Sequence, residues 1–267
     1  MPDFSQTYNI SVSFINVVVF IFGACIGSFL NVCIYRIPKD KSIIFPGSFC
    51  PVCRYKIPFY LNIPIISYII LGGKCKNCRT PISIRYPAIE LLTALFALAV
   101  VMKFNLTLEA LFWFSFIAVL IIITFIDIDF QIIPDILSIP GIFIFAFSPA
   151  AVPWMTLKES MLGILAGGGS LYFVAISYYL VRKEDGMGGG DIKLLAMIGA
   201  ATGWKGVFFT IMTASVTGTV AGLLIMLITR SVNTRLRLPF GPYLSFGAIL
   251  YIFFGTDIIR WYFNFLS

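Results

Sequence analysis

Eight apolar runs occupy most of this chain, and they severely limit the folds that it can adopt. They cover residues 14–35, 86–102, 107–126, 132–152, 160–181, 192–203, 206–229 and 240–265. Backbone polar groups in hydrocarbon must be satisfied within their own segment, so runs of this kind predict helices. A crossing takes about 20 residues, and the alternating ten-residue segments of a membrane barrel are not seen. We therefore expect an all-α polytopic membrane protein with about eight transmembrane helices.

Two of these runs are atypical. The run 192–203 is short for a full crossing, which favours a partial or tilted helix that lines a cavity. The run 132–152 contains Pro134, Pro140 and Pro149, so we expect a kink or an interruption there.

Residues 36–85 form a polar insert between the first two runs. The insert holds nine of the 19 Lys and Arg residues and one acid, Asp40. Positive charge in a short loop marks the cytoplasmic side. We therefore expect a first transmembrane helix within residues 1–35 with its N-terminus outside, a cytoplasmic insert at 36–85, and a membrane core at 86–267. The basic side chains should face anionic lipid or the C-terminal spans, which explains the net charge of +7 without nucleic acid.

The insert carries four of the six cysteines as two CxxC pairs. These are Cys50, Cys53, Cys75 and Cys78. Two such pairs present four thiolates tetrahedrally to zinc, and without histidine in the chain the site would be all-cysteine. Disulfides are the competing explanation, which a cytosolic location disfavours, and a thioredoxin-like pair would need a βαβ pattern. We predict one structural zinc ion, and we expect Cys25 and Cys33 to be packing residues.

Asp191 follows a glycine-rich stretch, residues 186–190, at the mouth of an apolar run. An acid in such a place is costly and marks a functional site. Gly188, Gly189 and Gly190 would let a substrate backbone approach closely. The alternative is a flexible loop in which Asp191 caps the next helix.

A second acid, Asp127, ends the third run. Counting crossings from a cytoplasmic insert places Asp127 and Asp191 at the same membrane face. Two carboxylates that meet in a low dielectric share one proton. This is the arrangement of an aspartic protease, where one carboxylate activates water and the other polarises the scissile carbonyl. The absence of histidine excludes Ser-His-Asp and Cys-His hydrolysis.

Three further acids lie near this face. We expect structural roles for Asp129 and Asp135, the latter at a helix start after Pro134. From the residues alone, Asp129 could take the place of Asp127. Glu90 is expected to pair with a basic residue of the insert, and a substrate contact is the alternative.

The motifs, taken in order, resemble those of the type IV prepilin peptidases, which are GxGD-type membrane aspartic proteases also called leader peptidase/N-methyltransferases. Residues 27–38 resemble the N-terminal signature of the family, the CxxC pairs its zinc domain, and residues 85–93 its next segment. Asp127 with Ile133-Pro134-Asp135, and residues 188–194 with Asp191, match the two catalytic motifs.

The resemblance implies an activity and selects Asp127 over Asp129. Such an enzyme of the bacterial inner membrane would cleave the basic leader from type IV prepilins and type II secretion pseudopilins, after a glycine at the cytoplasmic face. It would then methylate the new N-terminus with S-adenosylmethionine. Residues 27–38 and Glu90 are candidates for the methyl-transfer site.

Two other functions fit the same residues. One is a non-enzymatic membrane assembly factor whose zinc module docks partners. The other is a transporter that couples protons through Asp127 and Asp191.

Overall fold

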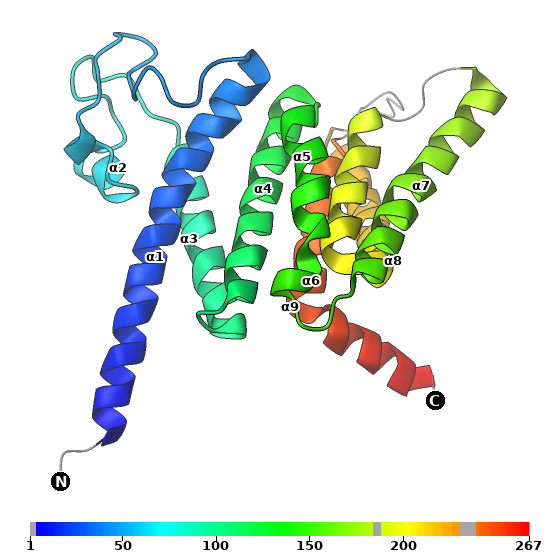
Figure 1. The fold of residues 1–267 in the computed structure, drawn as a ribbon. Helices are drawn as coiled ribbons and strands as arrows, with labels where there is room; N and C mark the ends of the chain where they lie inside the picture. Colours follow the sequence, from blue (N-terminus) through cyan, green and yellow to red (C-terminus); the bar gives the residue numbers. More distant parts are fainter. Residues whose placement is uncertain (1–3, 184–187, 230–238, 267) are drawn as a thin grey trace. The chain divides into compact units, whose positions relative to one another are not determined.

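The computed structural model describes residues 4–183, 188–229 and 239–266 (Figure 1). In these ranges the chain is helical, and its only β-type backbone pairings are two isolated bridges, so the predicted all-α fold is confirmed. The α-helices are α1 (Phe4–Arg36), α2 (Ile66–Ile70), α3 (Arg85–Phe104), α4 (Leu108–Phe130), α5 (Asp135–Ala146), α6 (Ser148–Ala151), α7 (Leu157–Arg182), α8 (Gly189–Thr229) and α9 (Gly241–Leu266). Short 3-10 turns occupy Ile37–Lys39 and Phe59–Leu61.

Five of the described helices are long and apolar enough to cross a membrane. They are Val12–Lys39, Arg85–Phe104, Leu108–Phe130, Leu157–Arg182 and Gly189–Ile228. The count differs from eight for local reasons. The run 132–152 is divided into α5 and α6, the runs 192–203 and 206–229 both fall within α8, and the apolar part of α9 that qualifies is short, Gly241–Gly255.

The chain divides into two compact units, Met1–Phe114 and Ser115–Ser267, with the boundary inside α4. In the first unit, α1 packs against α3 through glycines that leave no room for a side chain. A Cβ on Gly23 would lie 2.7 Å from Ala97 Cβ, and one on Gly27 would lie 2.7 Å from Glu90 Cα. The Asn31 amide then donates to the carbonyl of Tyr86 at 3.1 Å. Cys33 is buried as expected, whereas Cys25 is exposed on α1.

Arg36, at the end of α1, organises the start of the insert. Its side chain is buried, and its guanidinium donates to the carbonyls of Ser42 at 2.8 Å and Pro46 at 2.7 Å. A buried guanidinium needs such partners. The polar end of the first transmembrane helix is therefore satisfied by the loop that follows it.

In the second unit, α7 and α8 make backbone-to-backbone contact. Gly163 and Gly167 form a GxxxG motif on α7, and a Cβ on either would run into the backbone of α8 at Gly199 or Leu195. Small residues of this kind allow close helix packing in membranes. The α8 side chains beside this contact, including Leu194, Leu195, Met197 and Ile198, are fully buried.

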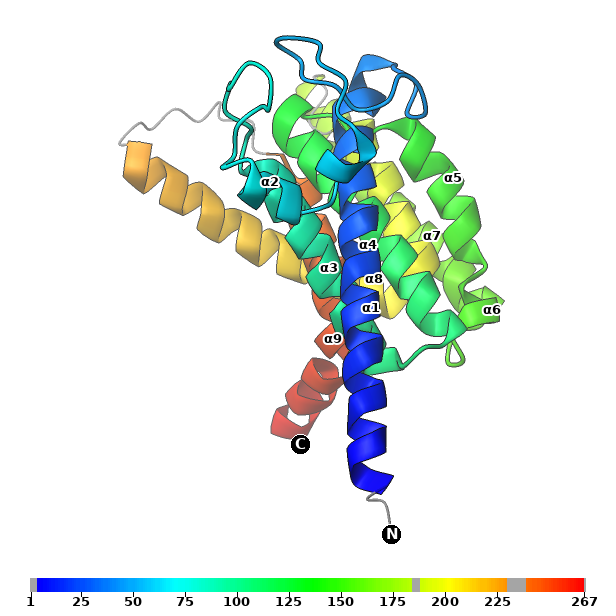
Figure 2. The same cartoon turned by 90° about the vertical axis from the view of Figure 1, so that its left-hand side faces the viewer.

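Gly203 interrupts α8 between the two runs predicted for this region. Its φ of +71° and ψ of 179° are non-helical, and positive φ favours glycine. The two parts of α8 consequently run in different directions (Figures 1 and 2). The short run 192–203 is thus the first, buried part of a broken helix, and it begins at Asp191.

Candidate active site and metal centre

Asp127 lies on the last turn of α4 and is only 5% exposed. Its Oδ2 accepts a hydrogen bond from the backbone N–H of Gly241 at 2.9 Å. Gly241 is the first residue of α9, where backbone N–H groups have no partner within the helix and suit an anion. The chain therefore orients one carboxylate oxygen of Asp127 with a group 114 positions away.

Asp191 lies in the first turn of α8, and its carboxylate is half-buried. Its N–H donates to Gly188 O at 3.2 Å. Asp127 and Asp191 lie close enough for their charges to interact. The end of α4 and the start of α8 thus bring two acids together at the border of apolar segments.

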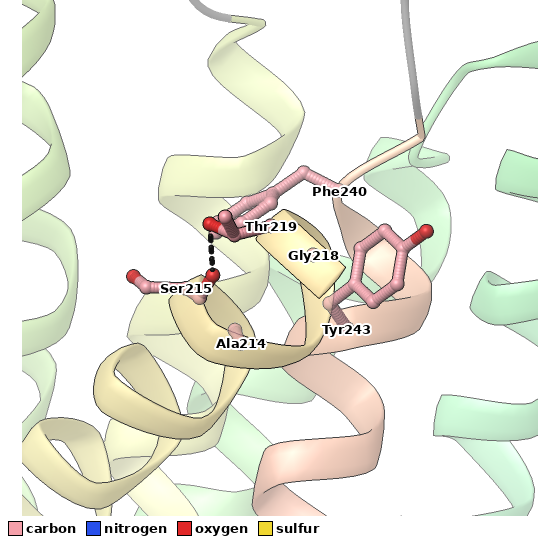
Figure 3. Close-up of a pocket in the computed structure, with 6 residues that line it drawn as sticks. All are labelled: Ala214, Ser215, Gly218, Thr219, Phe240 and Tyr243. Atoms are coloured by element: carbon pink, nitrogen blue, oxygen red, sulfur yellow. Dashed lines mark hydrogen bonds between the residues drawn. The ribbon is translucent and has the colours of Figure 1, made fainter. Parts of the chain in front are cut away.

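A cavity of about 340 Å³ lies along the turn of α9 that contacts Asp127 (Figure 3). Phe240 and Tyr243, which flank Gly241, form its aromatic wall, and the second part of α8 forms the rest. The α8 residues are Ala214, Ser215, Gly218 and Thr219. Its α8 residues are small, and the hydroxyls of Ser215 and Thr219 add polar groups to a lining that also contains the two rings.

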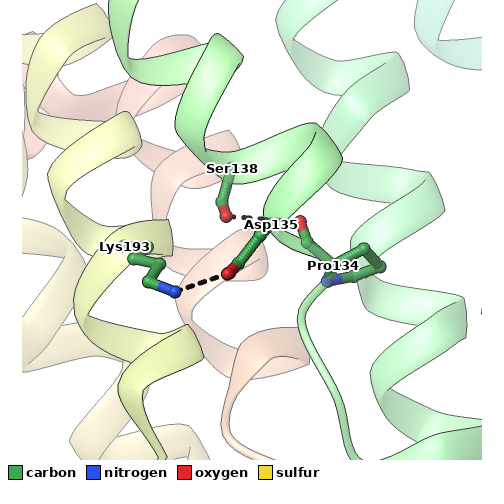
Figure 4. A network of polar contacts seen from close by, with 4 residues as sticks. All are labelled: Pro134, Asp135, Ser138 and Lys193. Atoms are coloured by element: carbon green, nitrogen blue, oxygen red, sulfur yellow. Dashed lines mark hydrogen bonds and ion pairs between the residues drawn. The ribbon is translucent and has the colours of Figure 1, made fainter.

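The loop between α4 and α5 and the first turn of α5 contact α8 on the two sides of Asp191. A Cβ on Gly190 would lie 2.8 Å from Ile133 Cβ, so Gly190 packs tightly on the loop. Lys193 Nζ lies 2.6 Å from Asp135 Oδ1, at the first turn of α5 (Figure 4). These two contacts connect the segment that follows Asp127 with the segment that carries Asp191.

The four cysteines of the insert converge on one point. Their Sγ atoms all lie within 4.8 Å of one another, with Cys50 and Cys78 3.8 Å apart and Cys53 and Cys75 3.9 Å apart. A tetrahedral site with Zn–S bonds of about 2.3 Å has edges of about 3.8 Å. The geometry of the four thiols therefore fits a metal ion.

Two matching turns build this cluster. The N–H of Cys50 donates to Tyr55 O at 3.0 Å, and that of Cys75 donates to Thr80 O at 2.9 Å. The Thr80 hydroxyl lies 3.2 Å from Cys78 Sγ, and this hydrogen bond lowers the pKa of the Cys78 thiol to about 6. A backbone hydrogen bond from Tyr55 likewise lowers the pKa of Cys53. Both effects favour the thiolate form that binds metal.

Comparison with known proteins places the chain in a family. Residues 21–104 match the bacterial peptidase A24 N-terminal domain, and residues 114–223 match the type IV leader peptidase family. A prepilin leader peptidase/N-methyltransferase of Pseudomonas aeruginosa is 34% identical over an alignment of 266 positions, which covers 91% of each chain. The chain belongs to the type IV leader peptidase family.

Other relatives with the same name agree with this membership. That of Aeromonas hydrophila is 34% identical over 93% of this chain and 94% of its own. That of Neisseria gonorrhoeae is 36% identical over 90% of each chain. No solved structure matches the chain. With five membrane-length apolar helices among its described residues, this member of the leader peptidase family is a multi-pass protein of the bacterial inner membrane.

In this leader peptidase family member, the three described glycines before Asp191 differ in the space available beside them. A Cβ on Gly189 would meet nothing within 4 Å, and one on Gly188 would only approach Asp191 Oδ2 at 3.9 Å. Gly190 is the exception, because Ile133 occupies the space beside it. Its small size is thus required by packing. Gly186 and Met187 lie outside the described residues.

Glu90 does not pair with a Lys or Arg side chain through its Oε2. That atom accepts the backbone N–H of Ile65 at 2.7 Å, and the carboxylate also bonds the side chain of Ser28. Glu90 therefore joins α3 to the insert, and Gly27 and Asn31 join α1 to α3. Asp129 is exposed on α4, and Asp135 is engaged by Lys193.

Sequence reasoning missed Gly241. Its only signal is the Gly-Pro pair that opens the last apolar run, which is common at helix starts and says nothing of a distant acid. A Cβ at this position would lie 2.7 Å from Asp127 Oδ2, so both the N–H and the absent side chain of Gly241 serve the site.

Proposed function

We propose that this chain removes the leader peptide of type IV prepilins and type II secretion pseudopilins and then N-methylates the new N-terminus. The geometry around the two acids carries the proteolytic half: the loop that follows Asp127 packs on Gly190, next to Asp191, and the two carboxylates lie within range of each other's charge. The relatives are prepilin leader peptidase/N-methyltransferases, which supports both halves.

The two aspartates would work as a proton-sharing pair. One carboxylate takes a proton from water as the water attacks the scissile carbonyl, while the protonated partner donates a hydrogen bond to the carbonyl oxygen. The Gly241 N–H binds one carboxylate oxygen of Asp127, so the other oxygen would interact with the attacking water or the scissile carbonyl. Gly188 and Gly189, with open space beside them, would let the substrate backbone approach.

The active site and the insert would face the cytoplasm, with the N-terminus outside. The nine basic residues between 36 and 85 support this orientation. The turn at 230–238, whose Arg230, Arg235 and Arg237 would also lie on the inner side, falls outside the described residues. In this layout residues 1–35 anchor the insert 36–85, residues 86–267 form the protease core, and the insert faces lipid and not nucleic acid.

Zinc is the metal that we assign to Cys50, Cys53, Cys75 and Cys78. Four sulfur ligands with tetrahedral separations favour zinc over the harder cations. When bound, the ion would cross-link the two turns of an insert that has little core of its own. It would have no part in peptide cleavage.

The S-adenosylmethionine site is a separate matter. The cavity of Figure 3 offers hydroxyls and aromatic rings but no charged side chain for the amino-acid end of this cofactor. Its lining therefore does not fit the whole molecule, and we derive no methyl-transfer step from it. Glu90 and residues 27–38, proposed from the sequence, have structural contacts in the first unit.

Mass spectrometry of a co-expressed prepilin tests the proposal. With the wild-type chain, the pilin should lose its leader and gain one methyl group at the new N-terminus. With Asp127→Asn, it should remain full-length. Full processing by the variant would support an assembly factor in place of a protease, and proton-dependent transport without cleavage would support a transporter.

A further inference from the structure

α2 (Ile66–Ile70) presents three isoleucines to the outside of the insert. Ile66, Ile69 and Ile70 are 53%, 69% and 74% exposed. Positions i, i+3 and i+4 lie on one face of a helix, so the three side chains form a continuous apolar face. The opposite side of α2 is tied down, since Ser67 is buried and the Tyr68 hydroxyl donates to Ile82 O at 3.4 Å.

A hydrogen bond to a transmembrane helix fixes the depth of this face. Ile65, directly before α2, donates its N–H to Glu90 Oε2 at 2.7 Å, and Glu90 is only 9% exposed. Glu90 lies five residues into α3, about 7.5 Å along the axis from Arg85 at 1.5 Å per residue. The start of α2 is therefore level with the second turn of α3, and both views place α2 beside this end of α3 (Figures 1 and 2).

The backbone at this contact is unusual, which indicates that the position of α2 is enforced. Ile65 has a φ of +62°, a region that β-branched residues rarely adopt. A conformation of this kind persists only where its surroundings determine it. The buried carboxylate of Glu90 is the partner that holds the Ile65 N–H.

Charge identifies what covers the isoleucine face. Lys and Arg outnumber acids nine to one in residues 36–85. Lys74, Lys76 and Arg79, which follow α2, are exposed. An apolar helix face in a segment rich in exposed basic side chains is the pattern of a segment that lies in the interface of an anionic bilayer.

We infer that α2 lies in the membrane interface, with Ile66, Ile69 and Ile70 among the upper acyl chains and the basic side chains of the insert at anionic headgroups. Two contacts then hold the insert at the membrane: the hydrogen bond from Ile65 to Glu90, and the contact of the isoleucine face with lipid. This docking surface goes beyond the proposed catalytic function and does not depend on it.

Photo-crosslinking in nanodiscs tests the inference. The full-length, zinc-loaded protein carries benzoylphenylalanine at position 69 or, as a matched control, at position 52. Ile69 and Val52 are apolar and equally exposed, at 69% and 65%, but Val52 lies between the cysteines of a CxxC pair. In discs that contain phosphatidylglycerol, lipid adducts should form several-fold more at position 69, and removal of phosphatidylglycerol should lower that yield. Equal yields at the two positions, or adducts at 69 with a second copy or with added prepilin in place of lipid, would overturn the inference.

A pair of Glu90 variants tests the anchor separately. Glu90→Gln keeps a carbonyl oxygen for the Ile65 N–H, so the excess of lipid adducts at position 69 should remain. Glu90→Ala removes the acceptor and should lower that excess to the level of position 52. Zinc content reports whether the insert is folded in each variant. An undiminished excess in zinc-loaded Glu90→Ala would overturn the claim that Glu90 sets the depth of α2.

Discussion

Lys193 Nζ lies 2.6 Å from Asp135 Oδ1, and this ion pair joins the first turn of α8 to the first turn of α5. The two side chains are 37% and 58% exposed, and a pair of such exposure contributes at most about 1 kcal/mol. That is too little to hold the fold. It is enough to bias where α8 begins, and Asp191 lies only two positions before Lys193.

Reversal of either charge of this ion pair should slow prepilin cleavage, and reversal of both should restore it. Asp135→Lys or Lys193→Asp alone replaces an attraction by a repulsion, which we expect to lower kcat/KM by roughly tenfold. The double reversal restores opposite charges and should recover most of the rate. Cleavage assays on the four proteins in nanodiscs measure this effect. Additive losses in the double variant would contradict a positional role.

Gly190→Ala should impair cleavage through packing. The new methyl group would lie 2.8 Å from Ile133 Cβ and push the α4–α5 loop away from α8. Overpacking of this size costs about 1–3 kcal/mol, and we expect roughly tenfold slower cleavage. Gly169→Ala, on α7, is the matched control, because nothing lies within 4 Å of a Cβ at that position. Ile133→Ala combined with Gly190→Ala should recover activity, and failure of this rescue would point to a direct substrate contact at Gly190.

Gly241→Ala should inactivate the protein without unfolding it. Its Cβ would lie 2.7 Å from Asp127 Oδ2, the oxygen that the Gly241 N–H now holds. A displacement of about 1 Å at a reacting group can cost about a hundredfold in rate. Gly218→Ala is the control, since its Cβ would make an ordinary contact of 3.6 Å with Tyr243. Equal cleavage rates for the two variants would argue against Gly241 as the group that positions Asp127.

Zinc should leave the insert on acidification, and Thr80 should set the pH at which it does. Thiols must lose their protons to bind metal, and the hydrogen bond from Thr80 lowers the pKa of Cys78 to about 6. Without the hydroxyl this pKa rises, so Thr80→Val should release zinc at higher pH than the wild type. Thr80→Ser retains a hydroxyl and should behave like the wild type. Zinc retained per chain after dialysis across the pH range is the measurement, and coincident curves for Val and Ser would contradict the assignment.

Local motifs could be predicted from the sequence because their chemistry lies within a few residues. The two CxxC pairs predicted a four-thiol cluster, and the structure brings their sulfur atoms together. Apolar runs predicted the helices. The division of these runs was harder to foresee. Gly203 changes the direction of α8 without ending it, and α5 accommodates Pro140 and ends at Ala146, shortly before Pro149 of α6.

Contacts between distant segments were not accessible from the sequence. Glu90 accepts a backbone N–H, which has no side-chain signature, although the expected partner was a basic residue. Gly241 contacts Asp127 across 114 positions. In each case the partner is a backbone group, and its position depends on the tertiary packing.

The rate of prepilin cleavage by purified aspartate variants tests the central claim most directly. Asp127→Asn and Asp191→Asn should each lower the rate by at least about a thousandfold, as the loss of one member of a catalytic unit does. Asp129→Asn, two positions from Asp127 and exposed on the same helix, should cleave at close to the wild-type rate. All three should retain zinc. Near-normal cleavage by Asp127→Asn or Asp191→Asn would contradict the two-aspartate account.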